Sequence, residues 1–136
     1  MSADYHSDRL ALSDLLAQYA AAVDDRDRVR YANCFTDDVE VVGFGQGAFS
    51  GRDAWVNYVW EALDKYSATQ HLLGVQLAEV EGNSASTRTD VQAMHQLAGS
   101  EEKFTLWATY LSEMRRTDNG WKISRHELLV RATQSH

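Results

Sequence analysis

The sequence predicts a single α+β domain in which N-terminal helices pack on one face of a curved, mostly antiparallel sheet. This prediction rests on a change in the spacing of apolar residues along the chain. Apolar residues first recur at helical spacing, whereas from residue 69 onward they alternate with polar residues as in half-buried strands. With 136 residues, 44% of them hydrophobic, the chain can bury one core, so residues 1–136 are expected to form one domain.

Three helices are expected before the main sheet. Residues 8–24 carry an apolar stripe at helical spacing, and Ser7 or Asp8 can cap its start. Residues 29–35 are expected to form a short second helix. Residues 50–53 resemble a helix start, and the apolar stripe that follows over residues 54–66 predicts the third helix.

The strands are predicted from alternation and from turn residues. A first strand over residues 39–44 is expected to lead through the turn Gly45-Gln46-Gly47 into a short return strand. Four long strands follow, separated by Gly-containing segments that suit hairpin turns. They are expected over residues 69–80, 85–95, 103–116 and 121–130.

Charge and composition narrow the classes of partner. The net charge is −7, with 13 basic against 20 acidic residues, and phosphate binding needs clustered cations, so nucleic acid is not expected as a partner. No apolar run approaches the roughly 20 residues that span a bilayer, so no membrane partner is expected. The chain does not open like a secretory signal, and its one cysteine, Cys34, fits a reducing compartment. These features predict a cytoplasmic protein.

Asp24 is the better placed of two adjacent acids at the end of the first helix. It lines up with Ala20 and Leu16 one and two turns back, whereas Asp25 lines up with a more polar stripe. Both the helix C-terminus and an apolar pocket are expected to raise the pKa of Asp24. A solvated acidic helix end is the alternative interpretation.

Two histidines fall on the more apolar faces of predicted strands. His71 shares its face with Leu73, Val75 and Leu77, and His95 shares its face with small residues that leave room for a ligand. A hydrogen-bonded structural role is the alternative for each. His6 and His136 in the tails, and His126 on the last strand, are expected at the surface.

Asp24 and His71 together predict a proton-transfer site, because a buried carboxylate can hold and charge an imidazole. With His95 they have the donor set of an iron or zinc site, although no close ligand spacing supports one, and no metal is expected. Tyr19 lies one and a half turns before Asp24, where its hydroxyl can polarise a carbonyl or simply pack.

Four segments carry a resemblance to a known family. VDDRD (23–27), CFTDDV (34–39), FSGRDA (49–54) and NGWKI (119–123) are similar to the SnoaL-like branch of the NTF2-like superfamily. This branch contains polyketide cyclases, scytalone dehydratase and a dehydrochlorinase. The resemblance spans nearly the whole chain and implies a cone-shaped α+β barrel, a fold that hosts many unrelated activities.

The resemblance also implies roles for three positions. Asp24 and His71 match the Asp-His dyad that scytalone dehydratase and the dehydrochlorinase use to abstract a proton, with the histidine as base. His95 matches the second histidine of scytalone dehydratase, which implies an acid that assists the leaving group. Scytalone dehydratase has Tyr where this chain has Val23, and the dehydrochlorinase has Lys where it has Tyr19, so neither specific activity is implied.

The function implied by the resemblance is a cofactor-independent lyase, foremost a dehydratase, acting on a small hydrophobic cyclic or polyketide-like substrate. An isomerase or cyclase would share the proton abstraction but expel no group. A non-catalytic module that binds a small ligand is the alternative of a different class. Relatives commonly pair through the outer face of the sheet, which implies a homodimer, or a homotrimer as in scytalone dehydratase. Gln76, Gln92, Thr109 and Leu111 are expected on that face.

Overall fold

The computed structural model describes residues 3–45 and 47–136. Its helices are α1 (Ala3–Asp24), α2 (Arg28–Ala32) and α3 (Arg52–Leu63), close to the three predicted from the sequence. α1 begins earlier than predicted, so Ser7 and Asp8 lie inside it and do not cap it. Asp8 instead accepts hydrogen bonds from Arg116 and from the indole of Trp121 at the far end of the sheet.

Within the described residues, seven strands form one curved sheet that does not close. Its order is β2-β1-β7-β6-β5-β3, with β4 paired to β5 beside β3, and the β1–β7 pair is parallel. The strands are β1 (Phe35–Val42), β2 (Ala48–Ser50), β3 (Tyr66–Leu73), β4 (Leu77–Glu81), β5 (Ser84–Leu97), β6 (Lys103–Thr117) and β7 (Gly120–Ser135). Parallel pairing of Phe35 with Ile123 draws residue 35 into β1, which shortens the predicted second helix. Gln46, which belongs to the turn predicted before β2, lies outside the described residues.

The strand predicted over residues 69–80 is two strands, and this changes which side chains face inward. The chain leaves the ladder after Leu73, where the Gly74 amide bonds the Asp90 carbonyl at 2.8 Å. Val75 is then 90% exposed, and Gln76 is only 7% exposed, with its side-chain amide donating to the Leu12 carbonyl. The expected inward face therefore holds for His71 and Leu73 but is wrong for Val75 and for Leu77, which is 64% exposed.

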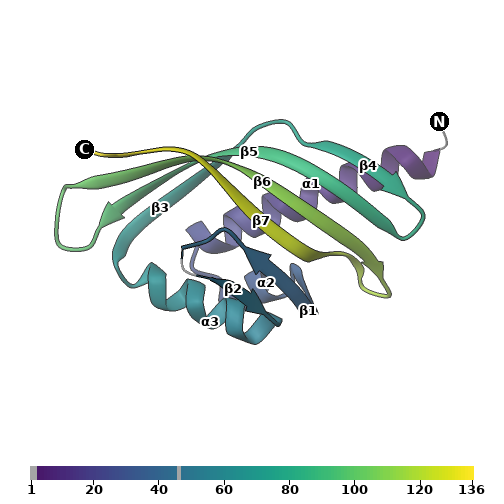
Figure 1. Cartoon of the computed structure of the whole chain (residues 1–136), viewed down its shortest axis with the longest axis horizontal. Coiled ribbons are helices and arrows are strands. Elements are labelled where there is room, and N and C mark those ends of the chain that lie inside the picture. The colour runs from purple at the N-terminus through teal and green to yellow at the C-terminus, as the bar shows by residue number, and fades with distance from the viewer. Residues whose placement is uncertain (1–2, 46) are drawn as a thin grey trace.

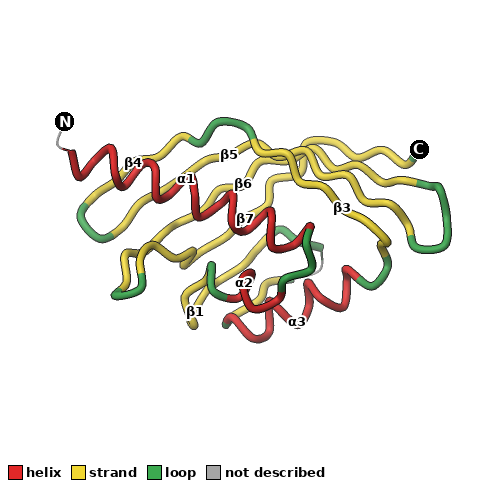
Figure 2. The backbone as a smooth tube through the Cα atoms, turned by 180° about the vertical axis from the view of Figure 1, so that it is seen from behind, coloured by secondary structure: helices red, strands yellow, loops and turns green. Residues whose placement is uncertain are grey.

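The three helices lie on the inner face of the sheet, as predicted. Figure 2 shows α1 running across this face, with α2 and α3 beneath its C-terminal end. The far ends of β5, β6 and β7 extend beyond α3 (Figure 1). Fully buried side chains from α1, β1 and β7, among them Leu12, Val39 and Ile123, form the core between helices and sheet. No helix of the described chain is long and apolar enough to cross a membrane.

The outer face of the sheet carries exposed apolar side chains. The register places Leu77 in one row with Leu111, and Leu72 in one row with Trp107. Gln76 and Thr109, which were expected to contribute there, are buried. We propose that copies of this chain associate through this face, because association would cover the exposed side chains of Leu72 and Leu77.

The expected solution species is therefore a homodimer or homotrimer with two or three times the 15.3 kDa mass of one chain. Sedimentation equilibrium at micromolar concentration measures this directly. Leu77→Glu should shift the protein toward monomer, since it places a charge in the contact. Leu10→Glu on α1 changes a leucine that is also exposed, at 73% against 64% for Leu77, and should have no effect. A wild type that sediments only as a monomer would contradict the proposal.

Candidate active site

A largely apolar cavity of about 300 Å³ lies between the helices and the inner face of the sheet. α1, α3 and strands β3, β5, β6 and β7 all contribute to its wall. The aromatic lining side chains are Tyr19, Tyr31, Phe44, Trp55, Tyr58, Tyr66, Phe104 and Tyr110. His71 and His95 also line it, so both histidines predicted on apolar strand faces meet at one cavity. A small, mostly apolar pocket with a few polar groups is the usual form of a small-molecule site.

The predicted pair of Asp24 and His71 is in direct contact at this cavity. His71 Nδ1 lies 2.8 Å from Asp24 Oδ1, and the side chains are 11% and 19% exposed. A carboxylate can only accept, so Nδ1 carries the proton and Nε2 keeps its lone pair. Nε2 has no hydrogen-bond partner within residues 3–45 and 47–136. The arrangement therefore presents a basic nitrogen to the cavity.

The pKa of Asp24 runs opposite to the sequence expectation. Burial raises it, as expected, but hydrogen bonds from His71 and Thr69 to the charged form outweigh burial, and the net pKa is lowered. Asp24 Oδ2 also accepts the backbone N–H of His71 at 2.8 Å. Asp24 thus stays an ionised acceptor that orients His71, and the expectation of a raised pKa is wrong because it omitted these donors.

Thr69 and Arg26 complete the surroundings of Asp24, and sequence reasoning missed both. The Thr69 hydroxyl donates to Asp24 Oδ1 at 3.0 Å, and Arg26 Nη1 donates to Thr69 Oγ1 at 2.9 Å. Thr69 and His71 are two residues apart on β3 and so share a face. The two-residue spacing could have predicted from the sequence that Thr69 lies on the same face as His71. The Arg26 contact could not be predicted in this way, because it depends on how α1 ends.

His95 faces the cavity close to His71, with ring centroids 5.9 Å apart. Its Nδ1 lies 3.2 Å from the Phe104 carbonyl and must donate to it, which leaves Nε2 as an acceptor. Burial, followed by the proximity of His71, lowers the pKa of His95. The acid role expected from the sequence needs a protonated ring, which these surroundings disfavour. Among the described residues, no His, Cys, Asp or Glu side chains are grouped so that they could hold a metal ion.

His126 is buried, which corrects its expected place at the surface. It is 0% exposed, with Nε2 2.9 Å from the Tyr19 hydroxyl and Nδ1 2.7 Å from Ser112 Oγ. The cause is a register shift in the β6–β7 pair between Glu113 and Met114, which reverses the alternation of β7 after Ile123. Burial lowers the pKa of His126 to about 3, so it is a neutral ring within an aromatic cluster.

Tyr19 lines the cavity, but its hydroxyl bonds His126 and not Asp24. Its ring packs against those of Tyr31 and Tyr110, which line the same cavity. Burial, then the neighbouring Tyr31, raises the pKa of Tyr19 well above its ordinary value. Tyr19 is therefore a neutral hydroxyl, and its predicted role toward a carbonyl remains a prediction.

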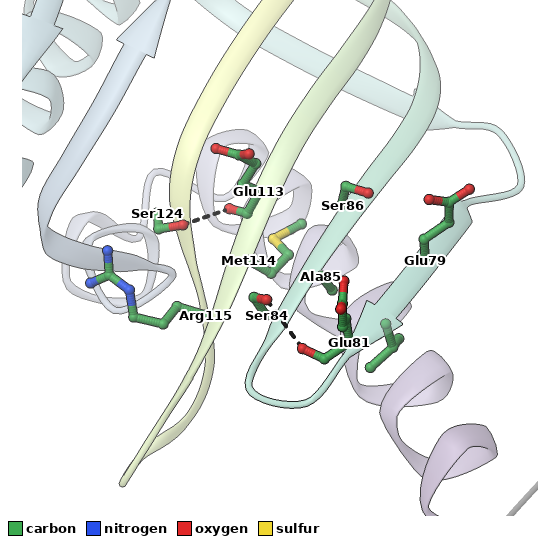
Figure 3. Close-up of a pocket in the computed structure, with 10 residues that line it drawn as sticks. Glu79, Glu81, Ser84, Ala85, Ser86, Glu113, Met114, Arg115 and Ser124 are labelled. Atoms are coloured by element: carbon green, nitrogen blue, oxygen red, sulfur yellow. Dashed lines mark hydrogen bonds between the residues drawn. The ribbon is translucent and has the colours of Figure 1, made fainter.

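A second, larger hollow of about 510 Å³ opens over β4 to β7 (Figure 3). Its wall carries Glu79, Glu81 and Glu113, and no imidazole. Two of its serine hydroxyls donate to backbone carbonyls, Ser84 to Glu81 and Ser124 to Glu113. Because both of these hydroxyls donate to carbonyls, and the described residues of this wall include no acid paired with an imidazole, the aromatic cavity is the better candidate for an active site.

The helices packed on a curved, open sheet are those of the NTF2-like fold. The model of the SnoaL-like domain matches residues 4–127, and the chain belongs to this family. A scytalone dehydratase-like protein of Novosphingobium aromaticivorans shares the fold with a TM-score of 0.92 at 22% identity, over 100% of this chain and 92% of its own.

Two relatives by sequence cover most of the chain. An uncharacterized protein of Mycobacterium tuberculosis strain H37Rv is 29% identical over 88% of this chain and 82% of its own length. Hexachlorocyclohexane dehydrochlorinase 1 of Sphingobium indicum is 27% identical over 90% of this chain and 80% of its own length. The family and these relatives support a lyase-type or related activity.

Burial of neutral His126 predicts a specific loss of stability in acid. Its pKa is about 3 in the fold and near 6.5 when unfolded, so the unfolded chain binds more protons between these values. The free energy of unfolding should therefore fall as the pH drops below about 6.5, by up to about 1.4 kcal/mol per pH unit from this group.

Denaturant titrations at pH 7 and pH 5 measure this loss. His126→Gln, which cannot take up a proton, should show a shallower pH dependence than the wild type. His6→Gln removes an exposed histidine and should leave the dependence unchanged. Equal pH dependence in the wild type and His126→Gln would refute the assignment.

Proposed function

We propose that this protein is a cofactor-independent lyase, foremost a dehydratase, that acts on a small hydrophobic cyclic or polyketide-like substrate. The observation that carries the proposal is the hydrogen bond of 2.8 Å between Asp24 and His71 at the wall of an apolar cavity. The dehydrochlorinase relative, whose name describes an elimination, supports the same reaction class.

His71 is the general base in this proposal. Its Nε2 takes a proton from a carbon next to a carbonyl, and Asp24 stabilises the resulting imidazolium and fixes the ring. The electron pair of the broken C–H bond forms the new double bond as the C–O bond to the leaving hydroxyl breaks. The hydroxyl takes the proton back from Nε2 and departs as water.

His95 and Tyr19 act on substrate oxygens. His95 Nε2 accepts a hydrogen bond from the leaving hydroxyl and holds it beside His71, which agrees with the neutral tautomer fixed by Phe104. Tyr19 is the candidate donor to the carbonyl, where charge develops as the proton leaves.

An isomerase is the second candidate, and one observation favours it. Neither imidazole brings a proton of its own to the cavity, because both Nδ1–H groups are bound elsewhere. Returning the abstracted proton to another carbon of the substrate needs no further acid, so the same site suits proton transfer within one molecule.

Replacing His71 by Ala should slow proton abstraction. Incubation of wild type with cyclic ketones in D₂O should bring deuterium into the position next to the carbonyl, as followed by NMR. His71→Ala should slow this exchange by about 10²–10⁴-fold, the usual contribution of a general base. His6→Ala is the matched control, and EDTA should leave the wild-type rate unchanged. Full exchange by His71→Ala would remove the dyad from the mechanism.

Asp24→Asn tests the orienting partner separately. An amide offers one acceptor and one donor where the structure needs acceptors at both oxygens, so the ring tautomer is released. The exchange rate should fall by an amount comparable with that of His71→Ala, and the double variant should lose little more, because the pair acts as one unit. Additive losses in the double variant would mean that the two residues act independently.

A further inference from the structure

We propose that Arg26 and Thr69 are positioning residues that form a one-way relay of hydrogen bonds into the Asp24–His71 pair. The inference rests on the proposed function for its consequence in catalysis, but its geometry stands apart from it. The relay comprises Arg26 Nη1 to Thr69 Oγ1 at 2.9 Å, Thr69 Oγ1 to Asp24 Oδ1 at 3.0 Å, and His71 Nδ1 to the same oxygen at 2.8 Å.

The direction of the relay is fixed by the chemistry of its first member. A guanidinium has donors only, so Thr69 Oγ1 must accept from Arg26. The single hydroxyl proton of Thr69 is then committed to Asp24. Oδ1 of Asp24 consequently receives two donors, Thr69 and His71, while Oδ2 receives the backbone N–H of His71. Three donors from one strand leave this carboxylate no other orientation.

Arg26 reaches Thr69 because of the way α1 ends. The amides of Arg26 and Asp27 bond the carbonyls of Val23 and Ala22, the pattern of a Schellman turn, and Arg26 occupies its left-handed position with φ 58°. Glycine is the usual residue there. The turn directs the Arg26 side chain back over the helix end, where Nη1 also bonds the Val23 carbonyl at 2.7 Å.

The relay does two things for the base. Its charge-assisted hydrogen bonds hold Asp24 in plane with Nδ1 of His71, which keeps Nε2 aimed into the cavity. It also draws electron density from Oδ1, so that the proton stays on Nδ1 of His71 and is not passed to the carboxylate. Burial alone would favour a protonated carboxyl, and Thr69 is one of the donors that oppose it.

Titration of Asp24 tests the relay without any substrate. The carboxyl ¹³C signal of Asp24 should titrate at higher pH in Thr69→Val, by about half a unit to one unit, because one donor to the charged form is lost. Thr69→Ser restores the hydroxyl and should restore most of the wild-type value. Thr36→Val removes another buried threonine hydroxyl, away from the site, and should leave the Asp24 titration unchanged.

Arg26→Gly tests the first member in a variant that the backbone accepts, since glycine suits the left-handed position. It should shift the Asp24 titration in the same direction as Thr69→Val. Both variants should lower the deuterium exchange rate by about tenfold with the fold intact by circular dichroism.

The outcomes separate the two proposals. An Asp24 titration unchanged in both Thr69→Val and Arg26→Gly would overturn the relay, even if His71→Ala is inactive. A shifted titration with fully active His71→Ala would instead uphold the relay as a feature of the fold and remove the proposed function.

Discussion

The carboxylate of Asp24 joins the end of α1 to the edge of the sheet, and the geometry of the site depends on this junction. β3 is the last strand of the main path, so its outward-facing amides have no strand to pair with. Asp24 Oδ2 satisfies one of them, that of His71, while Oδ1 holds the imidazole of the same residue. The helix end is thereby fixed to the residue that it orients. α1 also supplies Tyr19 and Val23 to the cavity wall, so a shift of the helix would disturb both the dyad and the pocket.

Burial favours the neutral forms of four other polar side chains at or beside the cavity. His126 and the three tyrosines Tyr19, Tyr31 and Tyr110 have pKa values displaced toward their neutral forms by burial. His95 is disfavoured as a cation for the same reason. His71 has a different neighbour, the ionised carboxylate of Asp24, which lies against its Nδ1 and fixes the orientation of its ring.

Local patterns in the sequence were sufficient to predict most of the architecture and the contact between Asp24 and His71. Helical spacing placed Asp24 inward, and strand alternation placed His71 and His95 on inner faces, which the structure confirms. The errors arose where the regular period breaks. A register shift in β7 turned His126 inward, and the interruption after Leu73 exposed Val75. Arg26 could not be assigned, because its contact depends on a left-handed turn together with a strand 43 residues away. The direction of the pKa shift of Asp24 could not be predicted either, because it depends on hydrogen bonds from His71 and Thr69 on β3.

The fixed tautomers of the two histidines restrict the stereochemistry of an elimination at this site. Both rings present an acceptor nitrogen, so in the proposed mechanism the imidazoles supply no proton other than the one that His71 takes from the substrate. A chloride can depart without a proton, but a hydroxide is a poor leaving group and needs one. Since the same Nε2 must both collect and deliver this proton, the C–H and C–O bonds have to lie on the face of the substrate that is turned toward His71. The proposed mechanism thus implies syn elimination, and the apolar walls would serve to hold a cyclic substrate with that face toward the base.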